Sequence, residues 1–119
     1  MSTSNPVQYL PAIRSALNPV APTFIRGTRA IDGDNLNNLP DDSILIDPIA
    51  APVINDYDDE YVIILLQVTA WSRSLLTASV NAEAAESVMK AMGWRLNAYR
   101  VAPTDDEFRG VQADYERLE

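Results

Sequence analysis

The chain contains no cysteine and no histidine, and its only lysine is Lys90. Without these side chains, disulfide bridges, thiolate or imidazole zinc sites, and Ser-His or Cys-His nucleophile pairs are all excluded. No apolar run approaches the roughly 18 residues of a membrane span, and the first residues lack the charged and apolar regions of a secretory signal. We therefore expect a protein made in the cytoplasm, without contact to a membrane, that is stabilised by packing or by assembly.

Basic residues are scarce throughout, and the net charge is −8 with a pI near 4.3. The distribution is uneven, because residues 1–30 carry three arginines and no acid whereas residues 31–60 carry nine acids and no base. Proteins that bind DNA or RNA displace counterions from phosphates with clustered Lys and Arg. This composition therefore argues against specific nucleic-acid binding and against docking on anionic lipid.

With 119 residues, of which 47% are hydrophobic and 22% charged, the chain has the size and composition of one globular domain. We predict a single domain over residues 1–119. Residues 1–6 are small and polar and predict a flexible N-terminal tail. The turn formers and acids of residues 31–42 and 49–60 predict two long acidic loops.

The N-terminal third predicts one helix and two strands. Apolar residues recur there at helical spacing, at Val7, Leu10, Ile13 and Leu17. Pro11 interrupts this pattern, so either the regular helix begins near Pro11 or the first turn is separately wound. Residues 23–30 and 43–47 are rich in β-formers, and Pro48 is expected to end the second strand.

Residues 61–71 form the longest apolar run and predict the central strand. Residues 62–66 are apolar at every position, which is typical of a strand buried on both faces. After Leu66, apolar Val68 and Ala70 alternate with Gln67, Thr69 and Trp71, which is typical of a strand buried on one face. Residues 72–77 lead into a helix that should end at Gly93. Its predicted buried stripe consists of Val80, Ala84, Val88 and Met92, widened by Ala85, Met89 and Ala91.

Residues 95–101 and 108–115 are strand-like and are joined by a turn-rich connector, as in a β-hairpin. Only the link between the central strand at 61–71 and this hairpin is a helix. The sequence therefore predicts an α+β fold with a mostly antiparallel sheet of four to five strands and two helices packed on one face.

Acidic residues supply the only candidate metal sites. The run Asp56-Tyr57-Asp58-Asp59-Glu60 offers oxygen ligands for Ca²⁺ but does not follow the EF-hand formula. A second run begins like an EF-hand loop at Asp32, but Leu36 stands at a ligand position and Ser43 replaces the closing Glu. We predict solvated loops, no metal and no cofactor. Because seventeen acids always provide accidental carboxylate pairs, we assign no catalytic residue and expect no enzyme.

Large side chains near the helix and in the hairpin suggest a subunit interface. Trp71 and Trp94 bracket the predicted helix, and the hairpin carries Arg100 and Arg109. Core packing is the ordinary explanation for the two tryptophans, and an interface is the alternative because Trp and Arg favour interface anchors. A lone chain of this length can scarcely cover both faces of residues 62–66, so a neighbouring subunit could cover Ile63 and Leu65.

Several segments together resemble the tail terminator, or tail completion, proteins of tailed bacteriophages. They are the leading helix at 11–17, the strand at 23–27, the strand Leu-Leu-Gln-Val-Thr-Ala-Trp-Ser-Arg-Ser at 65–74, the helix at 82–92 and the closing strand at 109–116. The resemblance implies a small α+β virion subunit that forms a homohexameric ring at the head-proximal end of the tail tube. Such a ring caps tube polymerisation, contacts the tube protein and the neck or connector protein, and contains no catalytic residues.

The acidic middle of the chain fits such a ring, because a lumen through which DNA passes should repel phosphate. We therefore predict that residues 32–42 or 56–60 face the lumen or the neighbouring ring, which adds Asp56, Asp58, Asp59 and Glu60 to the candidate interface. Two alternatives remain. One is a neck or head-completion protein, and the other is an acidic module that binds a basic protein partner.

Overall fold

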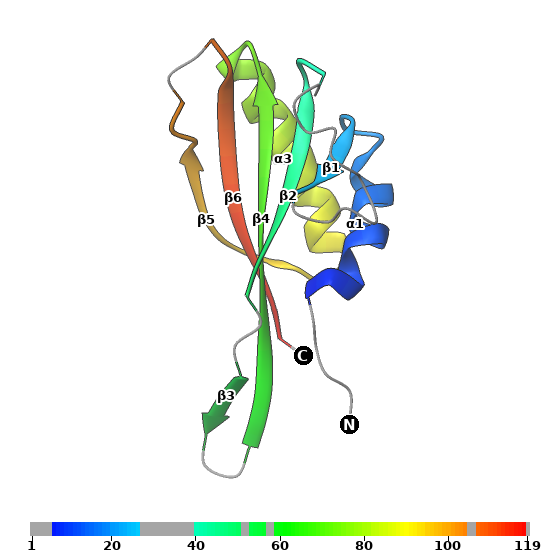
Figure 1. The fold of residues 1–119 in the computed structure, drawn as a ribbon, viewed down its shortest axis with the longest axis vertical. Coiled ribbons are helices and arrows are strands. Elements are labelled where there is room, and N and C mark those ends of the chain that lie inside the picture. Colours follow the sequence, from blue (N-terminus) through cyan, green and yellow to red (C-terminus); the bar gives the residue numbers. More distant parts are fainter. Residues whose placement is uncertain (1–5, 27–39, 51–52, 57–58, 105–106, 119) are drawn as a thin grey trace.

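A computed structural model describes residues 6–26, 40–50, 53–56, 59–104 and 107–118. In chain order its elements are η1 (Pro6–Tyr9), α1 (Leu10–Leu17), β1 (Thr23–Ile25), β2 (Ser43–Ala50), β3 (Val53–Asp56), β4 (Asp59–Ser72), α3 (Leu75–Ala91), β5 (Arg95–Val101) and β6 (Arg109–Leu118). Five strands lie in the order β1-β2-β4-β6-β5, and β3 pairs with β4 beside this path (Figure 1). The molecule is elongated, with extents of 50 × 28 × 26 Å.

The sheet is mixed but mostly antiparallel. Strands β1 and β2 are parallel, whereas β2, β4, β6 and β5 pair antiparallel in turn. Helix α3 connects β4 to β5, and β6 lies between these two strands. Both helices pack on the same face (Figure 1), so the predicted α+β architecture is confirmed.

The core lies between this face, which we call the inner face, and the two helices. On β4 the inner face consists of alternate, buried residues: Ile64, Leu66, Val68 and Ala70. They form one cluster with Ile13 and Leu17 of α1 and Met89 of α3. The first helical turn is separately wound as η1, which is one of the two arrangements expected from Pro11.

The predicted buried stripe of α3 is right at Ala85 and Met89, but its central line is wrong. The residues that face the sheet are Ala78, Ala82, Ala85 and Met89. Val88 and Met92 only flank the core, and Val80 is 56% exposed. A face made mostly of alanine has little bulk between helix and sheet, so α3 can pack closely while larger apolar residues point outward. Gly93 ends the helix as predicted, with φ +92°.

Two strand predictions also need correction. Pro48 does not end β2 but lies within it, next to a register shift between Pro48 and Ala50. Among the described residues, β1 pairs with β2 as far as Ile46, so Pro48 lies beyond this pairing. There β2 has one described neighbour, β4, and a missing N–H is tolerated. The predicted loop at 49–60 contains β3 and the first residues of β4, because its β-branched residues pair with those that follow the turn.

Most of the other predicted loop, 31–42, lies outside the described residues, and so do residues 1–5 of the predicted tail.

Candidate assembly surfaces

The outer face of the sheet points away from α1 and α3. On β4 it consists of the residues that alternate with the buried ones: Ile63, Leu65, Gln67, Thr69 and Trp71. Ile63, Leu65 and Trp71 are half-buried, whereas Thr69 is 2% exposed. The structure therefore brings three of the predicted interface residues onto one face of one strand, two in its first half and one near its end.

Trp71 lies over Gly110, its register partner on β6. A Cβ atom at Gly110 would lie 2.8 Å from two ring carbons of Trp71 and 2.9 Å from Cβ of Ala102. The indole therefore occupies the space that a side chain at this position would need. Sequence reasoning identified Trp71 but missed Gly110, because a glycine within a strand-like run does not indicate which ring will lie on it.

Polar side chains occupy the middle of the outer face. Arg100 of β5 donates two hydrogen bonds to the carboxylate of Asp114 on β6, at 2.8 and 3.1 Å, and one to the amide oxygen of Gln112 at 3.0 Å. Gln67 of β4 donates to the same carboxylate at 3.2 Å. The hydrogen bonds from Arg100 hold the pKa of Asp114 below its usual value, against the opposing effect of partial burial. Arg100, a predicted interface residue, thus links β5 to β6, and Asp114 links both strands to β4.

The other predicted interface residues are dispersed. Trp94 is 3% exposed and packs edge-on against Tyr9 at 5.6 Å between ring centroids, so it belongs to the core. Arg109 begins β6 and is exposed, and its guanidinium donates to the carbonyl oxygen of Phe108. Asp56 and Asp59 are register partners at the far end of the β3–β4 hairpin, and Glu60 is opposite Asn55. Asp58 lies outside the described residues.

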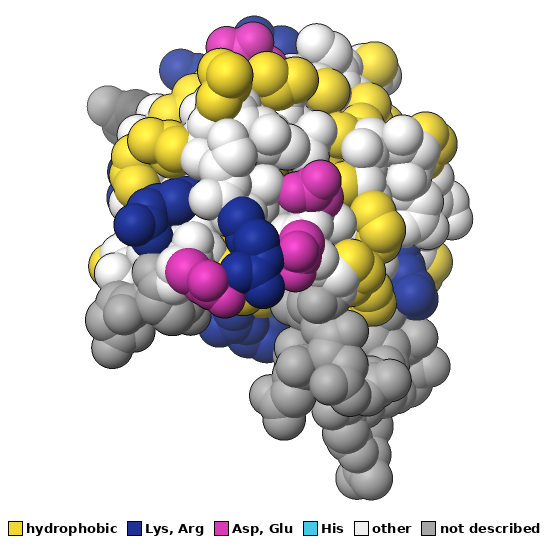
Figure 2. All heavy atoms as spheres, turned by 90° about the horizontal axis from the view of Figure 1, so that it is seen from above, with side chains coloured by type: hydrophobic (Ala, Val, Ile, Leu, Met, Phe, Trp, Pro, Cys, Tyr) yellow, Lys and Arg dark blue, Asp and Glu magenta, His cyan; other side chains and the backbone are white. Residues whose placement is uncertain are grey.

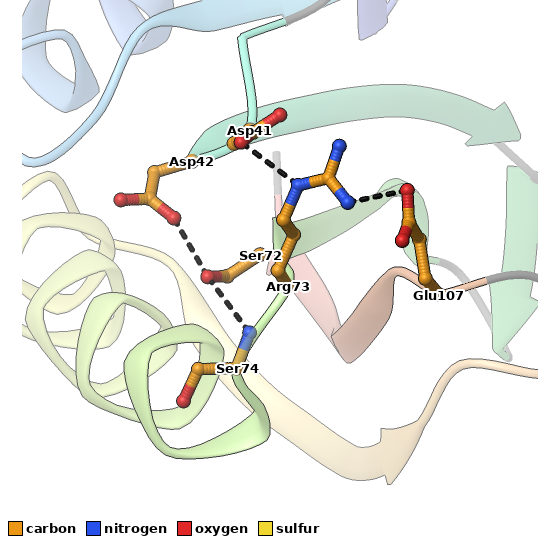
Figure 3. A network of polar contacts seen from close by, with 6 residues as sticks. All are labelled: Asp41, Asp42, Ser72, Arg73, Ser74 and Glu107. Carbon is orange, nitrogen blue, oxygen red and sulfur yellow. Dashed lines mark hydrogen bonds and ion pairs between the residues drawn. The ribbon is translucent and has the colours of Figure 1, made fainter.

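A network of charges joins three segments at the end of the sheet where β4 meets α3 (Figure 3). Arg73 donates to Asp41 at 2.9 Å, forms an ion pair with Glu107, and lies 4.9 Å from the ring centroid of Phe108. The hydrogen bond to Asp41, followed by that to Glu107, raises the pKa of Arg73. Arg73 thereby ties the segment before β2 and the β5–β6 connection to the start of α3.

The serines beside Arg73 fix the start of α3. The hydroxyl of Ser72 donates to Asp42 at 2.6 Å and accepts from the backbone N–H of Ser74 at 3.2 Å (Figure 3). Ser74 is the N-cap and accepts from the N–H of Thr77. Figure 2 views this end of the molecule and shows acidic and basic side chains side by side, with hydrophobic ones to either side.

The outward side of α3 and the edge strand β5 carry exposed apolar side chains. Leu76 is 74% exposed and Val80 one turn later is 56% exposed, and on β5 Val101 is 59% exposed. Tyr99 covers part of the gap between the two elements, since its hydroxyl lies 2.8 Å from Glu86 and 3.0 Å from the carbonyl oxygen of Ala82. Sequence analysis missed this surface because it assigned Val80 to the buried stripe.

In the part of the chain that the structure describes, no group of three or more acidic side chains is arranged to hold a metal ion. No helix there is long and apolar enough to cross a membrane.

Comparison with known proteins finds a similar fold in a solved structure. No protein-family model and no curated protein matches the chain. Among solved structures, it is similar to a chain in the virion of a native gene transfer agent (GTA) particle, with a TM-score of 0.65 and 10% identity. The likeness covers 95% of this chain and 90% of that chain. At this level of identity it shows a common fold.

Proposed function

We propose that this chain is a structural virion protein, a tail terminator that forms a ring at the head-proximal end of a phage-type tail tube. There it caps tube polymerisation and joins the tail to the head. The observation that carries the proposal is the fold shared, over nearly the whole of both chains, with a protein of a gene transfer agent virion. Since one fold can serve many functions, the resemblance of the element order to tail terminators is a necessary second support.

The distribution of apolar surface supports assembly. One set of exposed apolar residues, Leu76, Val80 and Val101, lies on α3 and β5, and a second set, the half-buried Ile63 and Leu65, lies on the outer face of β4. Sets of exposed apolar residues of this kind mark interaction surfaces. A closed ring requires two different surfaces on each subunit that meet head to tail, and the two sets are a natural pair for this. We propose a homohexamer.

The charge of the chain suits a ring through which DNA passes. With a net charge of −8, a lumen formed by several copies would repel phosphate and would not retain DNA. The segments at 32–42 and 56–60 carry much of this charge, and we propose that they face the lumen or the adjoining ring. The role is structural, with no catalytic residue and no cofactor.

A charge on the outer face tests the ring. Leu65 is half-buried on this face, so Leu65→Glu should leave a folded monomer and abolish rings. Ser15→Glu adds the same charge at an exposed position of α1, which carries neither apolar set, and should leave the rings intact. Light scattering over a range of concentrations, together with electron microscopy, measures both. Wild-type protein that stays monomeric at every concentration and also beside tube subunits would overturn the proposal.

A second experiment tests the position in the virion. Addition of the protein to polymerising tube subunits should shorten the tubes and leave rings on one end. Binding to the head connector without any effect on tube length would contradict capping and would favour the neck or head-completion alternative.

A further inference from the structure

The two edges of the sheet differ in whether their backbone groups have partners. At the β1 edge, the side chain of Asn18 accepts a hydrogen bond from the backbone N–H of Thr23 at 2.9 Å, and Arg14 donates to the carbonyl oxygen of Thr23 at 3.1 Å. Side chains of α1 and of its C-cap thus close that edge. At the other edge, β5 has β6 as its one neighbour among the elements that the structure describes (Figure 1). An edge without a cap can accept another strand.

Two residues of β5 present their backbone groups to this open edge. The N–H of Ala102 donates to the carbonyl oxygen of Gly110 at 2.8 Å, which fixes the hydrogen-bond pattern between β5 and β6. In an antiparallel pair, successive residues turn their backbone groups alternately toward the neighbouring strand and away from it. The groups of Arg100 therefore face β6, whereas those of Tyr99 and Val101 face the open edge. Each of these two residues offers one N–H and one carbonyl oxygen to an added strand.

Strand β5 has few of the features that protect exposed edges. It contains no proline and no lysine, and a register shift between Leu96 and Ala98 is its one irregularity. Proteins use all three of these features to prevent unwanted pairing at an edge. Because the register is regular from Ala98 to Val101, this part of β5 can accept a strand.

The inner-face side of this edge is apolar. Tyr99 and Val101 point to the inner face, where they are 40% and 59% exposed. The Tyr99 hydroxyl donates to the carbonyl oxygen of Ala82 on α3. Leu75 precedes Ala82 by two helical turns, so it lies on the same side of α3, and it is 43% exposed. An added strand would therefore meet apolar side chains here.

The outer-face side of the same edge is basic. The Arg95 side chain is 81% exposed, and its Nε lies 3.6 Å from Glu116, too far for a hydrogen bond. Among the described contacts, Arg100 uses three of its five N–H groups, on Asp114 and Gln112. Strand β5 carries these two arginines and no acid. Guanidinium groups with N–H groups to spare favour carboxylates on a neighbouring strand.

We propose that the open edge of β5 binds an extended segment of a partner protein in which apolar and acidic residues alternate. Its backbone bonds to Tyr99 and Val101, its apolar side chains lie on the inner face, and its carboxylates bind Arg95 and Arg100. A second copy of β5 is a poor occupant, because the pair would gather the arginines of both copies along one seam. This contact goes beyond the proposed ring, which uses side chains of α3 and β5 but not the backbone of this edge.

A synthetic peptide of alternating valine and glutamate, added to the full-length protein, tests this contact. It should bind saturably and protect the amides of Tyr99 and Val101 from hydrogen exchange, whereas the amide of Arg100 should change little because it is already paired with β6. The same peptide with lysine in place of glutamate is the control and should bind at least about tenfold more weakly. No saturable binding, protection at other strands, or tighter binding of the lysine peptide would overturn the proposal. It would also be overturned if higher protein concentration alone protected these two amides, since a second copy would then occupy the edge.

Two substitutions separate backbone pairing from side-chain contact. Val101→Pro removes an outward N–H and spares the hydrogen bonds to β6, so it should weaken binding of the glutamate peptide about tenfold or more. Val101→Ala keeps this N–H and should lose far less. Equal binding by Val101→Pro and the wild type would rule out strand addition.

Charge reversal gives an independent readout. Arg95→Glu should weaken binding of the glutamate peptide and strengthen binding of the lysine peptide, a gain that a misfolded protein cannot show. An unchanged preference in this variant would overturn the role of Arg95 in selecting acidic segments. A wild type that forms no rings would remove the proposed function and leave this contact standing.

Discussion

The two faces of the sheet share the same strands but differ in what completes their burial. On the inner face, Ile64 and Leu66 of β4 have no exposed surface, because α1 and α3 cover them. Their neighbours on the outer face, Ile63 and Leu65, are equally apolar yet remain half-buried. One 14-residue strand therefore carries an apolar surface that the chain buries itself and another that it leaves partly accessible.

This difference separates folding from assembly. Burial of apolar area contributes about 25 cal/mol per Å², whichever surface provides the cover. The inner face gains this contribution when the chain folds. The accessible part of the outer face can gain it only from another molecule, so substitutions on the two faces should affect different equilibria.

The largest expected effect comes from truncation of the inner face. Leu66→Ala removes a fully buried side chain and leaves a cavity, which should lower the free energy of unfolding by about 2–5 kcal/mol. The matched variant Leu65→Ala, next to it on the outer face, should cost the monomer about 1 kcal/mol but should weaken ring assembly. Urea denaturation of the monomer and light scattering of the assembled protein measure the two effects. Equal losses of monomer stability would contradict the comparison.

The inner face was largely predictable from the sequence. Period-two alternation after Leu66, the apolar spacing of Leu10, Ile13 and Leu17, and the stop at Gly93 depend on local chemistry, and the structure has all three. The orientation of α3 was not predictable from hydrophobicity, because alanine and valine both count as apolar. Which of them faces the sheet depends on how closely the helix packs, a tertiary property.

The outer surfaces were less accessible to sequence reasoning. Ile63 and Leu65 followed from a simple principle, that a short chain cannot cover both faces of its central strand. Residues 49–60 were predicted as a loop because their acids outweighed Val53 and Ile54, and pairing with Tyr61 and Val62 decided otherwise. A pocket lined by Ile63, Gly93, Arg95, Glu116, Arg117 and Leu118 gave no sequence signal, since its lining comes from three separate segments.

A smaller effect should follow from crowding of the outer face at Trp71. In Gly110→Ala the new Cβ would lie 2.8 Å from the indole, so the ring must move, at a cost of about 1–3 kcal/mol in the free energy of unfolding. Fluorescence should show a more exposed tryptophan. In a Trp71→Ala background the same substitution should cost less, leaving only the contact with Ala102. An unchanged cost in that background would show that the indole is not the obstacle.

The smallest effect should come from the polar centre of the outer face, where solvent screens the charges. Asp114→Asn removes the ion pair with Arg100 and should lower the free energy of unfolding by at most about 1 kcal/mol at neutral pH. The folded-state pKa of Asp114 lies below the unfolded value of about 3.9, so the pair stabilises the fold above that pH. This contribution is lost as the pH falls through the folded-state pKa, so the stabilities of wild type and variant should converge in acid.

Denaturation across pH measures the convergence of the two stabilities. Gln112→Ala, which removes the uncharged acceptor of Arg100, should show no such pH dependence. A difference between wild type and Asp114→Asn that persists unchanged in acid would mean that the hydrogen-bond geometry of Asp114, rather than its charge, joins these strands.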